Sequence, residues 1–182
     1  MIPKKIHYCW FGGKPIDKLG RKCIASWKKY FPGYEIIEWN ESNFDINSCQ
    51  YVREAYDAKK WAFVSDYARF KILYEHGGVY FDTDVEVIKS FDDILEKGNF
   101  MGCENVANQG ASLAVAPGLG FAVAPGVSVI KELLDDYEQS SFLKEDSSND
   151  LTTIVERTTK VLRKYGLKET NEIQTVADIT IY

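Results

Sequence analysis

The stretch that decides the fold runs from Ala62 to Asp84 and reads AFVSDYARFKILYEHGGVYFDTD. Its first half predicts a helix, because apolar residues recur three or four positions apart and so share one helical face. The pair Gly77–Gly78 ends this helix, since glycine tolerates the left-handed backbone that closes one. The β-branched and aromatic run 79–81 then predicts a short strand that delivers Asp82 and Asp84 at its carboxyl end. Open α/β sheets bind ligands at that end of their strands, so we expect chemistry here.

The two carboxylates Asp82 and Asp84 are separated by one residue and point the same way if the strand continues through them. Left alone they would repel, and a hard divalent cation removes this conflict by accepting oxygen ligands from them. Mg²⁺ or Mn²⁺ is usually held by one or two carboxylates and completed by substrate phosphates. The pair therefore predicts a metal site for a diphosphate ligand. Arg69, three residues after Asp66 on the preceding helix, adds a positive contact.

The same residues carry a resemblance to a known family. Ser65, Asp66 and Arg69, followed by the run Gly77–Asp84, resemble the core signature of the DXD-containing sugar transferases of capsular polysaccharide synthesis, glycosyltransferase family 32. The opening Ile2–Gly12, with the sequence IPKKIHYCWFG, resembles the first strand of that family. Together the matches span about the first half of the chain and are more specific than an Asp-x-Asp tripeptide alone.

The resemblance implies an α/β fold of the GT-A type, a Rossmann-like mixed sheet flanked by helices that binds a nucleotide sugar. It implies a Mn²⁺ or Mg²⁺ ion and a hexose transferred from a UDP- or GDP-hexose donor with retention of anomeric configuration. The acceptor would be a saccharide in cell-surface polysaccharide synthesis. The family also implies a further C-terminal segment with histidine, serine and tryptophan that completes the site and is absent from these 182 residues.

The resemblance assigns roles to particular side chains. Asp84 would bind the metal directly, and Asp82 would share the metal or hold the ribose and sugar of the donor. Asp66 and Arg69 would grip the transferred sugar and the diphosphate, so the predicted catalytic residues are Asp66, Arg69 and Asp82. The predicted donor-binding residues are Trp10, Ser65, Asp66, Arg69 and Asp82.

Trp10 has two interpretations. Residues 2–10 alternate as a strand does, and Gly12–Gly13 breaks that strand with a turn through which backbone can approach a ligand. Trp10 at the end of the strand is a core residue in one interpretation and stacks on a nucleotide base in the other. The family resemblance favours stacking.

Composition limits the possible classes. A chain of 182 residues with 45% hydrophobic residues predicts one globular domain, residues 1–182. The formal net charge of −5 argues against nucleic-acid binding. We find no membrane span or signal peptide and expect a cytoplasmic protein, with a peripheral position at the membrane as the alternative. The spacing of the cysteines is not that of a metal site or a disulfide framework, so we predict free thiols.

The remaining pattern predicts alternating helices and strands. The expected helices cover 18–31, 50–58, 91–95, 129–137 and 151–165, and the expected strands cover 34–39, 85–88, 100–104, 111–116 and 179–182. A polar loop at 105–110 is expected to line the cleft or to form an ordinary surface turn. The polar stretch 140–150 is expected to be a mobile loop. The basic outer face of helix 18–31 is either a solvated face or a contact for anionic lipid or an acidic acceptor.

Other functions remain open from the residues. Asp82 and Asp84 also resemble the first motif of haloacid-dehalogenase-like phosphatases, although Glu86 stands at the fifth position where that motif has Thr or Val. A non-catalytic nucleotide-sugar-binding protein is a second alternative. A third is purely structural: an Asp66–Arg69 salt bridge beside a solvated turn. The oligomeric state is not predicted.

Overall fold

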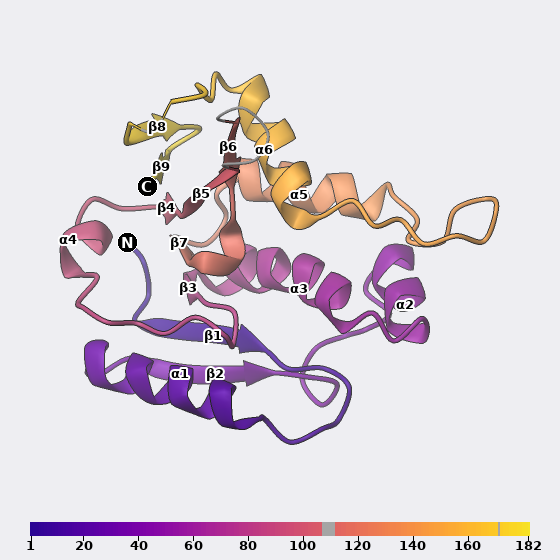
Figure 1. Cartoon of the computed structure of the whole chain (residues 1–182), viewed down its shortest axis with the longest axis horizontal. Helices are drawn as coiled ribbons and strands as arrows, with labels where there is room; N and C mark the ends of the chain where they lie inside the picture. The colour runs from indigo at the N-terminus through magenta and orange to yellow at the C-terminus, as the bar shows by residue number, and fades with distance from the viewer. Residues whose placement is uncertain (107–111, 171) are drawn as a thin grey trace.

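The computed structural model describes residues 1–106, 112–170 and 172–182 (Figure 1). The helices are α1 (Lys18–Tyr30), α2 (Gln50–Asp57), α3 (Trp61–His76), α4 (Asp92–Leu95), α5 (Ser128–Glu138) and α6 (Ile154–Lys164), with a 3-10 helix, η1, at Pro117–Leu119. The strands are β1 (Lys5–Cys9), β2 (Glu35–Trp39), β3 (Gly78–Tyr80), β4 (Phe100–Met101), β5 (Cys103–Val106), β6 (Ser112–Val115), β7 (Phe121–Val123), β8 (Gln174–Val176) and β9 (Ile179–Ile181). Most of the predicted elements are present within a few residues of their expected bounds.

Seven of the nine described strands form one mixed sheet in the order β2-β1-β3-β7-β4-β9-β8. β1 runs parallel to both β2 and β3, whereas β7 runs antiparallel to β3 and to β4. β5 and β6 form a separate antiparallel pair. The sheet confirms the predicted mixed α/β architecture. Because β1 and β3 are parallel neighbours, the residues that follow them meet at one edge of the sheet.

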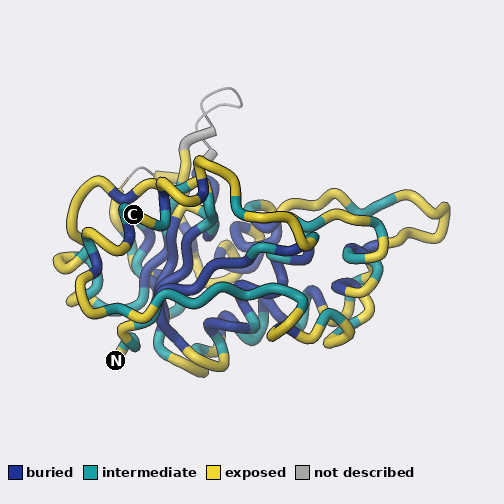
Figure 2. The backbone as a smooth tube through the Cα atoms, turned by 90° about the horizontal axis from the view of Figure 1, so that it is seen from below, coloured by how far each residue is buried: buried dark blue, intermediate teal, exposed yellow. Residues whose placement is uncertain are grey.

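Both faces of the sheet are apolar and covered. Side chains alternate along a strand, so Val79 and Phe81 pack with Trp27 of α1 on one face. Tyr80 points to the other face and packs into the larger cluster built with α2, α3 and α5. Figure 2 shows the buried strands at the centre of the molecule with exposed segments around them. Burial on both faces is expected for parallel strands that are connected through helices.

The glycine pair between α3 and β3 is required by local geometry. Gly77 and Gly78 have φ angles of 60° and 111°, a region that side chains disfavour. A Cβ on Gly77 would lie 2.6 Å from Cδ of Pro125, and one on Gly78 would lie 2.8 Å from the carbonyl oxygen of Lys5. The chain can therefore turn from the helix directly into the central strand only because both side chains are missing.

One prediction about the elements is wrong, and one condition set by the sequence is not met. Residues 85–88 do not form a strand; the segment runs along α1, where the Trp27 indole donates to the Val85 carbonyl at 2.8 Å. The strand also does not continue through Asp82 and Asp84, which was the condition for both carboxylates to point the same way, because β3 ends at Tyr80 and a turn follows. The alternating apolar residues of 85–88 predicted a strand, but this segment packs against α1 instead of pairing with another strand.

Two further predictions concern the loops 105–110 and 140–150. The predicted cleft-lining loop 105–110 lies mostly outside the described residues. The polar stretch 140–150 forms an exposed arm between α5 and α6, with one antiparallel bridge between Leu143 and Asn149 (Figures 1 and 2). Its mobility stays a prediction. Within the described ranges, none of the helices has the length and apolar character needed to cross a bilayer.

Candidate active site

A cleft of about 690 Å³ opens where β1 and β3 end. Its walls come from the loop after β1, the turn after β3, the first half of α3, the region of η1 and the start of α6. This is the place where a ligand is expected in an open sheet. The predicted site residues Trp10, Ser65, Asp66, Arg69, Asp82 and Asp84 all line the cleft.

Arg69 is the centre of the charged part of the site. Its side chain is only 4% exposed, and it donates from Nη2 to Asp66 at 3.0 Å and from Nη1 to Asp82 at 3.1 Å. Nε donates to the Ser65 carbonyl at 3.1 Å, which fixes the plane of the guanidinium. Burial opposes the charge, but neighbouring Tyr80, Asp82 and Asp66 raise the pKa of Arg69 above its ordinary value. The salt bridge expected within α3 therefore extends to the DXD turn.

Asp82 is held in place on several sides. Both carboxylate oxygens are engaged, since Oδ2 accepts from Arg69 and Oδ1 accepts from the Tyr80 hydroxyl at 3.2 Å. Burial keeps the pKa of Tyr80 well above its ordinary value, so this hydroxyl remains a donor. The Asp82 amide donates to the Gly118 carbonyl at 3.0 Å. The side chain of Asp82 is nevertheless 37% exposed, so its free lone pairs reach the cleft.

Gly118 has the backbone position that allows this arrangement. A Cβ built on Gly118 would lie 2.0 Å from Asp82 Oδ2 and 3.1 Å from Arg69 Nη1. Only a residue without a side chain lets η1 approach the Asp82–Arg69 pair so closely. From the sequence, Pro117–Gly118 predicted a turn and gave no indication that it touches the site.

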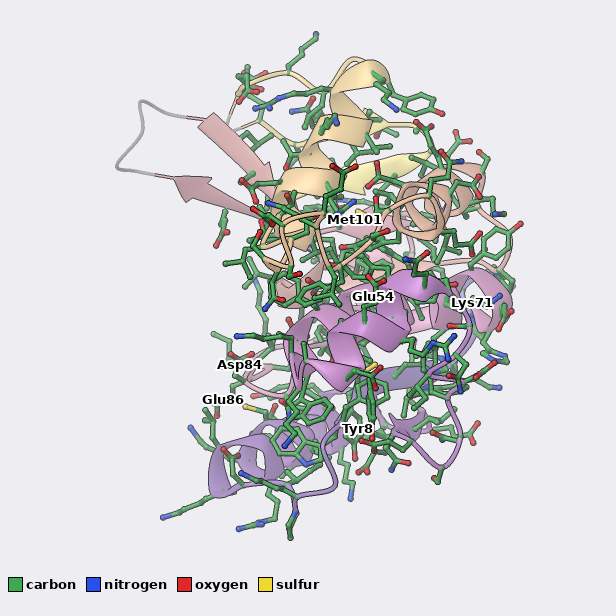
Figure 3. The ribbon with its side chains drawn as sticks, turned by 90° about the vertical axis from the view of Figure 1, so that its right-hand side faces the viewer. Tyr8, Glu54, Lys71, Asp84, Glu86 and Met101 are labelled. Carbon is green, nitrogen blue, oxygen red and sulfur yellow. The ribbon has the colours of Figure 1, made fainter. Side chains whose placement is uncertain are left out.

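Asp84 differs from Asp82 in its surroundings. It lies in the turn that the Val85 amide closes by donating to the Asp82 carbonyl at 3.0 Å, and its side chain is exposed. Figure 3 shows Asp84 and Glu86 above α1 on the same side of the molecule. The turn thus presents one fixed carboxylate and one free carboxylate to the cleft.

The oxygen ligands that Asp82 and Asp84 offer fit a hard divalent ion that takes its remaining ligands from elsewhere. Asp82 and Asp84 offer only carboxylate oxygens, which suit Mg²⁺ or Mn²⁺. Across the described part of the chain, no cluster of three or more His, Cys, Asp or Glu residues could enclose a metal. An ion at this turn would therefore need oxygens from a phosphate ligand or from water, as expected for Mg²⁺ in phosphate-binding sites.

Asp66 is buried beside the cleft. Burial raises the pKa of Asp66 to about 6, and the ion pair with Arg69 offsets only part of this effect. Asp66 is thus charged at neutral pH but titrates well above the usual range of a carboxyl group. Ser65 uses its hydroxyl within the helix, donating to the Trp61 carbonyl at 3.0 Å, and its carbonyl orients Arg69.

Trp10 forms part of the cleft wall and is half-buried. Its indole donates to the Lys14 carbonyl at 2.6 Å, which closes the glycine turn beneath it. Trp10 also packs on the apolar cluster around Trp27, so one ring face belongs to the wall while base stacking stays a prediction. The Gly12 amide donates to Glu41 at 2.7 Å, which ties this turn to the loop after β2.

Three residues of the site were missed by sequence reasoning. Lys14 lines the cleft and supplies a cation, Tyr80 donates to Asp82, and Gly118 makes room for that carboxylate. The spacing was a signal for Tyr80, because a tyrosine two residues before an aspartate points to the same side in extended backbone and can reach it. No local pattern identified Lys14 or Gly118.

The comparisons with known proteins agree with this geometry. The fold is similar to that of a solved structure described as PaToxG Glycosyltransferase, with a TM-score of 0.64 over 90% of this chain and 69% of that chain, at 18% identity. This likeness shows the fold, which is a mixed α/β fold of the GT-A-like class. Residues 17–101 match the family described as glycosyltransferase sugar-binding region containing DXD motif. This matched region contains five of the six predicted site residues, all except Trp10.

The curated relatives are longer proteins. Subversion of eukaryotic traffic protein A of Legionella pneumophila is 26% identical over 80% of this chain and 26% of its own length. An uncharacterized glycosyltransferase, L373, of Acanthamoeba polyphaga mimivirus is 34% identical over 59% of this chain and 45% of its own length. Inositol phosphoceramide mannosyltransferase 1 of Schizosaccharomyces pombe is 29% identical over 55% of this chain and 33% of its own length. The chain therefore spans less than half the length of each of these relatives.

Proposed function

We propose that the protein is a metal-dependent retaining glycosyltransferase that moves a hexose from a nucleotide diphosphate sugar to a saccharide acceptor. The observation that carries this proposal is the pair of unlike carboxylates at the edge of the cleft. Asp82 is fixed by Arg69 and Tyr80, whereas Asp84 is exposed in the same turn. A fixed carboxylate beside a free one is suited to hold a cation and the diphosphate that the cation binds.

The charged residues would have two roles at the diphosphate: the carboxylates bind the metal, and the cations contact the donor. Asp84 would hold the Mn²⁺ or Mg²⁺ ion directly and Asp82 would share it; when bound, the ion supplies positive charge for the leaving diphosphate. Arg69 keeps Asp82 in position and offers its remaining N–H groups to the donor. Lys14 adds a second positive charge in the cleft. These groups would stabilise negative charge where it develops during transfer.

The remaining residues would orient the donor. Trp10 would stack on the base from the wall of the cleft, and Asp66 would accept hydrogen bonds from hydroxyls of the transferred hexose. Asp66 suits this role because Arg69 holds its carboxylate at the cleft and the group is ionised at neutral pH. Oriented binding of donor and acceptor supplies a large part of the rate enhancement in group transfer.

The choice of donor and acceptor rests on the relatives and on the motif. One relative is named a mannosyltransferase, which favours a hexose, and UDP and GDP are the candidate nucleotides. For the acceptor we propose a saccharide of a cell-surface polysaccharide such as a capsule, as the family resemblance implies. We also propose a cytoplasmic location, which is an expectation from the sequence pattern and not from the resemblance.

A phosphatase fits the site less well. Its nucleophilic aspartate would need electron-rich oxygens, whereas both oxygens of Asp82 accept hydrogen bonds, one of them from the Arg69 guanidinium. A nucleotide-sugar-binding protein without activity is the competing function, and donor hydrolysis separates the two. The protein is incubated with UDP- and GDP-hexoses and Mn²⁺, and released hexose is measured. We expect slow metal-dependent release from one donor. Tight donor binding without any release, with or without added saccharides, would favour the binding protein.

A further inference from the structure

The outer face of α1 carries an unusual concentration of positive charge. Its exposed cations lie three, four or seven residues apart and therefore form one stripe along the helix. We call them the cationic stripe: Lys18, Arg21, Lys22, Lys28 and Lys29. The 13-residue helix contains no acidic residue, although the whole chain has a net charge of −5. At about 1.5 Å per residue, the stripe is about 17 Å long.

The stripe keeps most of its charge available. Among the ion pairs of the described residues, only Lys22 of the stripe meets a carboxylate, that of Glu86 at 2.7 Å. The guanidinium of Arg21 donates to the Ile16 carbonyl, and Lys29 lies over the ring of Tyr30 with Nζ 4.8 Å from its centroid. Neither of these contacts neutralises charge, so the face retains a positive potential toward solvent.

Large apolar side chains lie beside the stripe and are exposed. Ile88 is 76% exposed and lines a groove of about 320 Å³ together with Lys22 and Lys29. Leu19, on the flank of α1, is 52% exposed. Cations around exposed aliphatic side chains are typical of surfaces that settle in the headgroup region of a bilayer. A nucleic acid would gain little from Ile88, so the combination favours lipid.

This surface is joined to the edge of the cleft. The segment directly after Asp84 is bound to α1 by the Trp27–Val85 hydrogen bond, the Lys22–Glu86 pair and a 2.9 Å hydrogen bond from the Val87 amide to Ser26. Figure 3 shows Asp84 and Glu86 together above α1. Whatever holds α1 therefore also fixes the orientation of the DXD turn.

We propose that the cationic stripe and Ile88 dock the protein on an anionic membrane surface, with the cleft held beside the headgroups. Acidic headgroups meet the lysines, and Ile88 enters the interface. Docking places the transfer site where a membrane-bound acceptor is presented. The binding itself needs neither donor nor metal, so it can fail while the proposed transferase activity stands.

Vesicle co-sedimentation of the whole chain without donor tests this proposal. The vesicles are pure phosphatidylcholine or phosphatidylcholine mixed with phosphatidylglycerol. We expect binding only to the anionic vesicles and loss of binding at high salt, where charges are screened. The triple variant Lys18→Gln, Lys28→Gln, Lys29→Gln is expected to bind on the order of 100-fold more weakly, from about 1 kcal/mol for each lysine near the surface.

A matched control has the same change of charge elsewhere. The variant Lys144→Gln, Lys160→Gln, Lys168→Gln alters three exposed lysines outside α1 and is expected to bind like the parent protein. Ile88→Ser is expected to weaken binding while the salt dependence remains. Equal loss in both triple variants, absence of binding to anionic vesicles, or tight binding to a DNA duplex in place of vesicles would overturn the proposal.

Discussion

At the scale of single residues, the site depends on one buried arginine that forms ion pairs with two carboxylates. Arg69 is 3% exposed and lies between Asp66 and Asp82. Removing one partner from such a buried arrangement leaves an uncompensated charge, which is far more costly than losing a surface ion pair. Arg69 therefore links the stability of α3 to the position of the DXD turn.

The stacking role of Trp10 is tested by truncation. Trp10→Ala is expected to weaken nucleotide binding by about 1–3 kcal/mol, the usual range for base–aromatic stacking, while the fold persists. Calorimetry with UDP and GDP measures the affinity, and circular dichroism reports the fold. If the variant unfolds, Trp10 is a core residue and the stacking role is wrong.

His7 predicts how stability depends on pH. The ring is fully buried, with Nδ1 accepting from the Trp39 indole at 3.0 Å and Nε2 3.0 Å from the Gly77 carbonyl oxygen, so the neutral form with a proton on Nε2 fits. Burial lowers the pKa of His7 from 6.5 to about 4. Because only the unfolded chain takes up the proton between these values, the contribution of His7 is complete above about pH 6.5. It falls by about 3 kcal/mol as the pH drops toward 4.

Urea denaturation of the wild type and His7→Gln across this pH range measures the effect. Glutamine keeps a hydrogen-bond donor but does not titrate, so the variant should lose less stability than the wild type as the pH falls. Asp66 acts in the opposite direction, because its raised pKa lets the folded protein bind the proton first between about pH 4 and 6. The difference between wild type and variant isolates His7. Parallel stability curves would show that His7 is not held neutral.

At the scale of elements, η1 is the support of the DXD turn. Gly118→Ala would place a methyl group 2.0 Å from Asp82 Oδ2 without requiring an unusual backbone angle. We expect the Asp82 carboxylate to move and metal-dependent nucleotide binding to fall, with a loss of unfolding free energy of about 1–3 kcal/mol from overpacking. Calorimetry and urea denaturation measure the two effects.

Gly102→Ala is the control for that substitution. Its Cβ would lie 3.4 Å from Cβ of Leu119, an ordinary contact in the same region, and its backbone angle is also unexceptional. This variant should bind nucleotide like the wild type. If both alanine variants bind normally, the close approach of η1 does not position Asp82.

The elements also show what the sequence could predict. Periodicity located α1 and α6, because each buries one clear face. It also located α3, although that helix is buried on most sides, and local signals marked helix ends, such as the capping box at Thr153 and Glu156. Periodicity failed at 85–88, where an alternating pattern reflects packing on α1 rather than strand pairing. β7 lies between two predicted turns, and its pairing with β3 and β4, which are distant in the sequence, is contained in no local pattern. β8 was missed although it forms a local hairpin with β9, because its turn places Ala177 and Asp178 at positive φ without a glycine to mark it.

The candidate site was predictable to a similar extent. Every side chain chosen from the motif lines one cleft, since parallel β1 and β3 bring their following residues together. The direction of each carboxylate was not predictable. Asp82 turns to Arg69 because β3 ends before it, and the support from Gly118 comes from a residue 36 positions away in the chain.

At the scale of the whole molecule, charge and topology separate two surfaces. The DXD turn presents acidic oxygens to the cleft, while α1 presents a basic face next to it. The contacts between α1 and residues 85–87 connect these surfaces rigidly. A transfer site and a docking surface would thus share one orientation.

The most direct test of the central claim is titration calorimetry of UDP and GDP with and without Mn²⁺, using the wild type and Asp84→Asn. An amide cannot supply the anionic metal ligand, so the variant should lose metal-dependent affinity by more than about tenfold, or about 1.4 kcal/mol. Asp57→Asn, the same change at an exposed position on α2, should bind like the wild type. Metal-dependent binding that is unchanged in Asp84→Asn, or nucleotide binding by the wild type that ignores Mn²⁺, would contradict the account.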